Sequence, residues 1–291
     1  MKTTLDQYRR EMEDYFNAAL LHETIPDKLV EAMRYSLMAG GKRVRPVLCL
    51  VWHELLGGNR ADIVDFAAAL ELIHTYSLVH DDLPAMDDDA YRRGQPSNHA
   101  RFGEPMAILA GDGLLTEAVH LMLAPELPPS SVVNACREVT RAAGPRGMVG
   151  GQVLDMGLNG PAPDNLEQLK TMHGMKTGAM LRAACTGGAL LAGASSSDLA
   201  SAASYGENLG LAFQVADDIL DIEGDEATMG KPVGSDEQMQ KSTYPGLLGL
   251  EPSRQMGQDL AERAVEAIDA YSGDRADFLA DLARYVVRRA E

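Results

Sequence analysis

The stretch DIVDFAAALELIHTYSLVHDD, residues 62–82, decides the fold. Its apolar residues recur every three or four positions, which places Phe66, Leu70 and Ile73 on one face of a helix. We expect Asp62 to cap the start of this helix. The same spacing runs through most long segments, and alternating β-branched runs are scarce, so the sequence predicts helices nearly throughout.

The connections between the expected helices are short and rich in proline and glycine, as in LLGGNRA, PELPPSS and LNGPAPDN. Asp164 and Glu167 resemble a capping box that opens the helix after the last of these. The Ala- and Gly-rich residues 178–193 indicate helices that approach one another closely. We find no long polar linker and no internal repeat, so one all-α domain over residues 1–291, a large helical bundle, is expected.

Charge and cysteine content restrict the classes of partner. The net charge of −17 argues against nucleic acid or an anionic membrane surface, because the average field repels phosphate. Cys49, Cys136 and Cys185 are odd in number and far apart, which favours reduced thiols. The N-terminus lacks the apolar run of a signal peptide, and no window approaches the roughly 20 apolar residues of a membrane-spanning helix, so a cytoplasmic protein is expected.

An acidic cluster, HDDLPAMDDDAYRRG, ends the helix that decides the fold. Upstream of it, His74, Ser77 and Asp81 form a polar stripe on the otherwise apolar helix. Pro84 removes a backbone donor and should end the helix, so the turn that follows can fold further carboxylates back toward Asp81. Asp89 is expected to be only a solvated charge.

A second acidic cluster, FQVADDILD, covers residues 213–221. Asp217 and Asp221 lie one helical turn apart on one face, and Gln214 joins them one turn earlier. Solvated helix ends remain an alternative for a single charge run, but two clusters in apolar helices favour hard oxygen ligands for Mg²⁺. Neither cluster has the spacing of a calcium-binding EF-hand loop.

Basic residues gather beside glycines despite the acidic average. Arginine matches phosphate oxygens in a bidentate manner, lysine acts as a point charge, and glycine lets the backbone approach a ligand. The residues concerned are Lys42, Arg43, Arg45, Arg92, Arg93, Lys176, Lys231 and Lys241. Together with the aspartates they predict sites for two anions, one bound through Mg²⁺ and one bound by Arg and Lys alone.

These segments, in this order, resemble the trans-prenyl diphosphate synthases of the bacterial farnesyl diphosphate synthase type. The segments that carry the resemblance are GGKRVRP, LIHTYSLVHDDLPAMDDDAYRRG, GQVLDMG, MKTGAM, FQVADDILD, GKPVGSDEQMQKSTYPGLLG and YVVRRA. The resemblance runs from about residue 35 to the C-terminus. It implies the isoprenoid synthase helical fold with a central active-site cavity, and condensation of isopentenyl diphosphate with an allylic diphosphate.

The resemblance also implies roles for individual residues. The metal ligands would be Asp81, Asp82, Asp87, Asp88, Asp217 and Asp221, with roughly three Mg²⁺ ions per site once the allylic substrate is bound. Arg92, Lys176, Lys231 and Lys241 would bind the allylic diphosphate, and Lys42, Arg45, His74 and Arg93 would bind isopentenyl diphosphate. Oxygens of Lys176, Thr177 and Gln214 would face the allylic cation and steady its charge. Three of these residues have an alternative role. His74 could be a histidine of the core, Gln214 could make a hydrogen bond between helices, and Lys241 could be a charged residue of a loop.

Product length would depend on bulk below the first aspartates. Tyr76, with Ser77 beside it, lies five residues before Asp81, roughly 7.5 Å along the helix, and can form the floor of the hydrocarbon pocket. A C15 product, (2E,6E)-farnesyl diphosphate, is therefore expected, with geranyl or geranylgeranyl diphosphate as alternatives. A terpene cyclase or a non-catalytic synthase subunit is less favoured, because both aspartate motifs and the Lys42 segment are intact. The resemblance further implies a homodimer.

Overall fold

The computed structural model describes residues 2–19, 24–160, 163–223 and 241–288. The described chain is almost entirely helical, with one antiparallel ribbon of two-residue strands, β1 (Tyr91–Arg92) and β2 (Gln95–Pro96). The all-α prediction is confirmed. No helix within these residues combines the length and the apolar character that crossing a bilayer requires.

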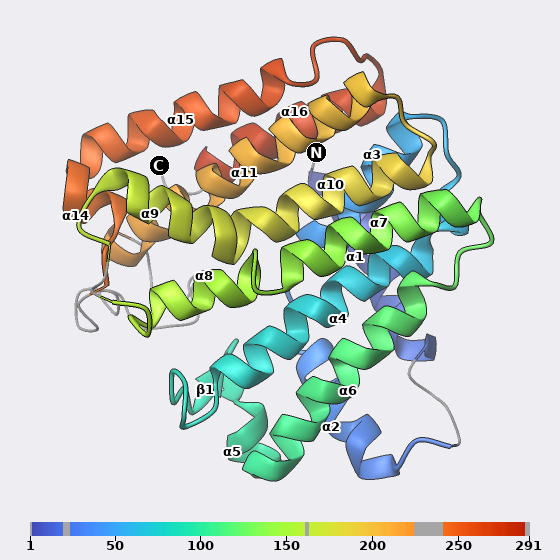
Figure 1. The fold of residues 1–291 in the computed structure, drawn as a ribbon, viewed down its shortest axis with the longest axis vertical. Coiled ribbons are helices and arrows are strands. Elements are labelled where there is room, and N and C mark those ends of the chain that lie inside the picture. The colour runs from blue at the N-terminus through green and yellow to red at the C-terminus, as the bar shows by residue number, and fades with distance from the viewer. Residues whose placement is uncertain (1, 20–23, 161–162, 224–240, 289–291) are drawn as a thin grey trace. The chain divides into compact units, whose positions relative to one another are not determined.

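The chain forms two compact units. We call residues 2–47 and 61–127 the N-terminal unit, and residues 48–60 and 128–291 the C-terminal unit. The single domain predicted from the sequence stays a prediction. Figure 1 shows the course of the chain through each unit.

The N-terminal unit is built around α4. Its helices are α1 (Lys2–Ala19), α2 (Asp27–Leu37), α4 (Val64–Asp81), α5 (Asn98–Phe102) and α6 (Glu104–Met122), and the first turn of α3 (Val44–Leu55) belongs to it. Phe66, Leu70 and Ile73 are buried as predicted, and Ala67, Ala68 and Ala69 are buried with them. A helix that is apolar nearly all round packs as a core helix, and α4 packs against α6 and α2.

The C-terminal unit stacks α10 between α7 and α11, and α11 against α15 (Figure 1). Its helices are α7 (Pro129–Ala143), α8 (Met148–Asp155), α9 (Leu166–His173), the π-helical turn η2 (Gly174–Gly178), α10 (Ala179–Leu191), α11 (Ser196–Glu223), α14 (Tyr244–Leu248), α15 (Leu250–Glu266) and α16 (Asp274–Arg288). A Cβ atom on Gly210 of α11 would lie 2.6 Å from the Cα atom of Gly178. The close helix approach predicted for residues 178–193 is confirmed.

Two predicted helix starts are wrong by a few residues. The residue before α4 is Ile63, which makes no side-chain cap, and Asp62 belongs to a short 3₁₀ turn, η1 (Arg60–Asp62). The cap of α9 is Asn165, whose side chain accepts a hydrogen bond from the Gln168 amide at 3.0 Å. The side-chain cap therefore lies one residue later than the sequence pattern indicated, and the Gln168 side chain accepts a hydrogen bond from the Asp164 amide at 3.2 Å. All three cysteines are free.

Candidate functional site

In the N-terminal unit, the chain turns back on itself where α4 ends. α4 ends at Asp81, and the Asp87 amide donates to the Asp81 carbonyl oxygen at 2.8 Å. The Asp88 amide donates to the Leu83 carbonyl oxygen at 3.1 Å, and Asp88 has a positive φ of 54°. The turn predicted from Pro84 is thus present, and it brings the Asp87 backbone directly to the end of the helix.

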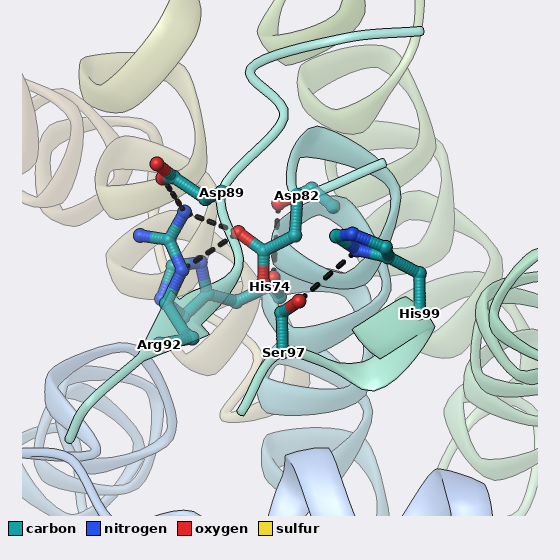
Figure 2. A network of polar contacts seen from close by, with 7 residues as sticks. His74, Asp82, Asp89, Arg92, Ser97 and His99 are labelled. Atoms are coloured by element: carbon teal, nitrogen blue, oxygen red, sulfur yellow. Dashed lines mark hydrogen bonds and ion pairs between the residues drawn. The ribbon is translucent and has the colours of Figure 1, made fainter. Parts of the chain in front are cut away.

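Arg92 holds two of the aspartates of this cluster (Figure 2). Its Nε donates to Asp82 Oδ1 at 2.8 Å, and its Nη2 pairs with Asp82 and, at 3.0 Å, with Asp89 Oδ2. Burial raises the pKa of the Asp82 carboxyl, which is 2% exposed, and Arg92 opposes that rise. Asp89, predicted to be only a solvated charge, is instead a partner of Arg92. Arg92 acts here as the counter-ion of both aspartates, and its diphosphate role stays a prediction.

His74 lies in a cluster of guanidinium groups. Burial lowers the pKa of His74 well below its ordinary value, and the positive charges of Arg45, Arg93, Arg43 and Arg92 lower it further. His74 is therefore neutral at physiological pH, so its ring adds no charge to the surrounding cations. A neutral imidazole among arginines can still donate one hydrogen bond to an anion.

The loop before α3 contributes Arg43 to this cluster and contacts Arg93. Arg93 donates to the Gly40 carbonyl oxygen, and a Cβ atom on Gly41, whose φ is 128°, would lie 2.8 Å from Arg93 Nη1. Arg43 is buried and pairs with Glu71 of α4 at 2.7 Å, whereas Lys42 is exposed. The structure thus brings Gly40, Arg43, Arg93 and His74 together, and Lys42 and Arg45 flank Arg43 in sequence.

Tyr76 is buried in α4, with 8% of its surface exposed. Its ring meets the ring of His80 edge to face at 5.8 Å between centroids, and a nitrogen of His80 lies 3.1 Å from the Ile108 carbonyl oxygen of α6. Ser77 donates to the His74 carbonyl oxygen at 2.9 Å. Tyr76 is therefore held from the side by a histidine that is itself fixed to the neighbouring helix.

In the C-terminal unit, the π-helical turn presents Lys176 and Thr177. Residues 174–178 form this turn, which continues from α9 and leads directly into α10. Such a wide turn inside a helix is rare and frequently occurs at functional sites. Lys176 Nζ lies 2.5 Å from Asp155 Oδ2 of α8, and Lys241 Nζ lies 3.5 Å from the same oxygen.

A chain of hydrogen bonds connects this turn to α11 and α14. Thr177 donates to Gln214 Oε1 at 3.2 Å, and Gln214 Nε2 donates to Asp218 Oδ1 at 2.9 Å. Asp218 Oδ2 accepts a hydrogen bond from the Tyr244 amide at 3.0 Å. The helix-to-helix hydrogen bond considered for Gln214 is thus present. Gln214 places the Thr177 hydroxyl relative to the second aspartate cluster.

The three aspartates of α11 differ in burial. Asp218 is 2% exposed and is committed to Gln214 and to Tyr244. Asp217 is half-buried, and Asp221, one turn later, is buried. The sequence analysis assigned Asp217 and Asp221, not Asp218, to the metal, and the partners of Asp218 are consistent with that division.

The donor set fits Mg²⁺ that is shared with a substrate. Among the described residues, no three His, Cys, Asp or Glu side chains are grouped so that they alone could hold a metal ion. Mg²⁺ usually keeps several waters and binds through one or two carboxylates together with substrate phosphates. Within each unit, the acidic cluster supplies carboxylate oxygens of the kind that Mg²⁺ prefers. Lys231 lies outside the described residues.

Two polar residues of α8 were not among the site residues predicted from the sequence. Asp155, in the segment GQVLDMG, is the shared partner of Lys176 and Lys241. Gln152, one turn earlier, has both amide side-chain atoms buried, with no hydrogen-bond partner among the described residues. The available signal was their spacing of three residues, which places both on one helix face.

Comparison with known proteins places these features in a family. Residues 26–276 match the family described as Polyprenyl synthetase. A geranylgeranyl diphosphate synthase of Cyanophora paradoxa is 43% identical over 99% of this chain and 96% of its own. A farnesyl diphosphate synthase of Geobacillus stearothermophilus is 51% identical over 77% of this chain and 76% of its own. The apo crystal structure of an FPP/GFPP synthase from Zymomonas mobilis is similar with a TM-score of 0.87, at 33% identity over 98% of each chain.

Proposed function

Because the chain belongs to the polyprenyl synthetase family and is a prenyltransferase of that family, we propose that it condenses isopentenyl diphosphate with dimethylallyl or geranyl diphosphate to give farnesyl diphosphate. The observation that supports the proposal is the presence of one group of cationic residues within each unit. Lys176 and Lys241 meet at one carboxylate, whereas His74 lies among arginines. Two diphosphates with different chemical fates require two such sets.

We assign the set around Lys176 to the allylic diphosphate. Lys176 and Lys241 would bind its phosphate oxygens, as would Arg92, with Lys231 as a further candidate. Mg²⁺ bound at Asp81, Asp87, Asp88, Asp217 and Asp221, with Asp82 as a further candidate ligand, would offset the negative charge that develops as the diphosphate departs. The Thr177 and Gln214 oxygens, ordered by their mutual hydrogen bond, would steady the positive charge on the allylic carbon.

We assign the set around His74 to isopentenyl diphosphate. This substrate keeps its diphosphate through the reaction, so no charge develops there that a metal must offset. Lys42, Arg45 and Arg93 carry permanent positive charge, and neutral His74 can donate a hydrogen bond without requiring a proton from solution. We expect binding of isopentenyl diphosphate to be insensitive to the protonation of His74 near neutral pH, because the pKa of His74 lies well below its ordinary value.

The C15 product rests on Tyr76. A buried aromatic ring five residues before Asp81, held by His80, is suited to stop a growing hydrocarbon chain. A geranylgeranyl product is the second candidate, because the relative that matches almost the whole chain is named a geranylgeranyl diphosphate synthase. The relative with the higher identity is named a farnesyl diphosphate synthase.

We also propose a homodimer in the cytoplasm. Helix α6 exposes three large apolar side chains, Ile108, Leu109 and Val119. Exposed apolar side chains can contribute to an interface between two copies of the chain. Light scattering after gel filtration measures the mass directly, and a mass of one chain, 31.3 kDa, would exclude the dimer.

The function is tested by incubating the protein with isopentenyl diphosphate and either dimethylallyl or geranyl diphosphate, with Mg²⁺ or with EDTA. We expect elongation only with metal, and a C15 product by chromatography after dephosphorylation. A hydrocarbon formed from one allylic diphosphate alone would indicate a cyclase. The absence of any elongation with metal would contradict the proposal, and a C20 product would select the second candidate.

A further inference from the structure

We propose that Asp155 is a positioning residue for the allylic substrate, because it holds the ammonium groups of Lys176 and Lys241 together where they bind the diphosphate. The inference rests on the proposed function and deepens it. The proposal gives a role to the GQVLDMG segment, one of the segments that resemble the prenyl diphosphate synthases.

The geometry brings together three segments that are distant in sequence. Asp155 ends α8, Lys176 lies in the π-helical turn and Lys241 precedes α14. Both ammonium nitrogens approach Asp155 Oδ2, at 2.5 and 3.5 Å. The Asp155 side chain is only 10% exposed, and the two lysines are about a quarter exposed, at 26% and 29%. The carboxylate thus faces inward, and the lysines remain reachable from solvent.

The packing fixes this arrangement. A Cβ atom on Gly151 would lie 2.3 Å from the backbone nitrogen of Lys176, so α8 touches the π-helical turn directly, one helical turn before Asp155. Only glycine permits such an approach of two backbones. The ion pair between Asp155 and Lys176 therefore joins two elements that are already in contact, unlike a surface pair between mobile side chains.

The charges agree with this role. Burial raises the pKa of Asp155, but the Lys176 and Lys241 charges and the hydrogen bond from Lys176 outweigh it, so the net pKa lies below the ordinary value. Asp155 is thus ionised at neutral pH. Burial lowers the pKa of His173 to about 4, so this neighbour adds no charge. One carboxylate between two ammonium groups leaves a net positive charge for a substrate anion.

Asp155 lowers the cost of assembling this anion site. Two ammonium groups at one place repel each other, and each lysine side chain loses rotamer entropy when it is ordered. Asp155 offsets both costs before the substrate arrives. An ammonium group has three donors, so the hydrogen bond to Asp155 leaves two for phosphate oxygens. The competing role, in which Asp155 occupies the lysines and must be displaced by the diphosphate, predicts the opposite change in affinity.

The test is steady-state kinetics of Asp155→Asn, which keeps the shape of the side chain and removes its charge. We expect KM for geranyl diphosphate to rise by about tenfold or more, the loss typical of one charge-assisted hydrogen bond, with KM for isopentenyl diphosphate unchanged. Glu167→Gln is the matched control, because Glu167 is an exposed carboxylate that pairs with Lys170 at 3.6 Å. An equal rise of both KM values, no change, or tighter binding of geranyl diphosphate would overturn the proposal.

A double-mutant cycle separates positioning from a general loss of structure. Lys241→Met alone should also raise KM for geranyl diphosphate. In the double variant with Asp155→Asn, the fold-increase in this KM should be smaller than the product of the two single fold-increases, because both changes disrupt the same ion-paired cluster. Should Asp155→Asn fail to fold, Lys241→Met with unchanged KM for geranyl diphosphate would still overturn the proposal. Wild-type elongation is measured first, so a failure of the proposed function would be visible before any variant is compared.

Discussion

Replacing Glu71 by alanine should destabilise the N-terminal unit strongly. The Arg43 Nη1 to Glu71 Oε1 distance is 2.7 Å, and the two side chains are 0% and 3% exposed. Without Glu71, the guanidinium keeps the Leu37 carbonyl oxygen, at 2.5 Å, and the face of the Phe16 ring, 5.3 Å from its centroid. Removing one partner of a buried pair typically costs about 3–5 kcal/mol, because the other charge stays buried without compensation.

Urea unfolding followed by circular dichroism measures this loss. The double variant Arg43→Met, Glu71→Leu should recover most of it, because apolar residues can replace a buried ion pair at little cost. Glu262→Ala, which breaks the exposed pair with Arg284 at 2.9 Å, serves as the control and should cost less than about 1 kcal/mol. A loss for Glu71→Ala no larger than that of the control would refute the reasoning.

The Glu71→Ala substitution should also weaken the binding of isopentenyl diphosphate. Arg43 has a positive φ of 52° and stands between Lys42 and Arg45, so its side-chain partners fix the backbone that presents both. We expect KM for isopentenyl diphosphate to rise in Glu71→Ala at temperatures where the variant is still folded. An unchanged KM would show that the loop holds its shape without the ion pair.

Three further predictions follow from the described contacts. Gly41→Ala should raise KM for isopentenyl diphosphate in steady-state kinetics, because the added Cβ atom would collide with Arg93. Gly40→Ala is the control, because Gly40 also has a positive φ but has open space around it, so this variant measures the effect of backbone strain alone. Tyr76→Ala should lengthen the product beyond C15, and an unchanged product length on chromatography would exclude it as the floor of the pocket. Because the pKa of His173 is lowered to about 4, the unfolded chain binds more protons below pH 6.5, so the stability should be full above that pH. As pH falls toward 4 it should decline by up to about 3 kcal/mol, and thermal melts of His173→Asn should show a smaller decline.

The sequence predicted what depends on local chain chemistry. Periodicity identified the helices, Pro84 identified the turn after α4, and the small residues from 178 to 193 identified a close approach of helices. These features arise from backbone preferences within a few residues, so a single sequence is enough to find them. The capping box at Asn165 was misplaced by one residue, because several polar side chains in a row can satisfy the same backbone amides.

The sequence could not predict partners that only the tertiary structure brings together. Asp155 is 86 residues from Lys241 in the chain, and nothing local marks it as the residue between two lysines. Arg92 shows the converse case. The resemblance implies a diphosphate ligand, and the structure additionally pairs its guanidinium with Asp82 and Asp89, which folding brings within reach.

In both Asp-Asp pairs, the two residues differ in burial. In each pair the second residue, Asp82 or Asp218, is 2% exposed and held by named partners, while Asp81 and Asp217 are more exposed. Asp82 binds Arg92, and Asp218 binds Gln214 and the Tyr244 amide. Adjacent helical residues point about 100° apart, so the two carboxylates of a pair can have different surroundings. In each pair, the second aspartate is therefore committed to protein partners, to Arg92 in one and to Gln214 and the Tyr244 amide in the other.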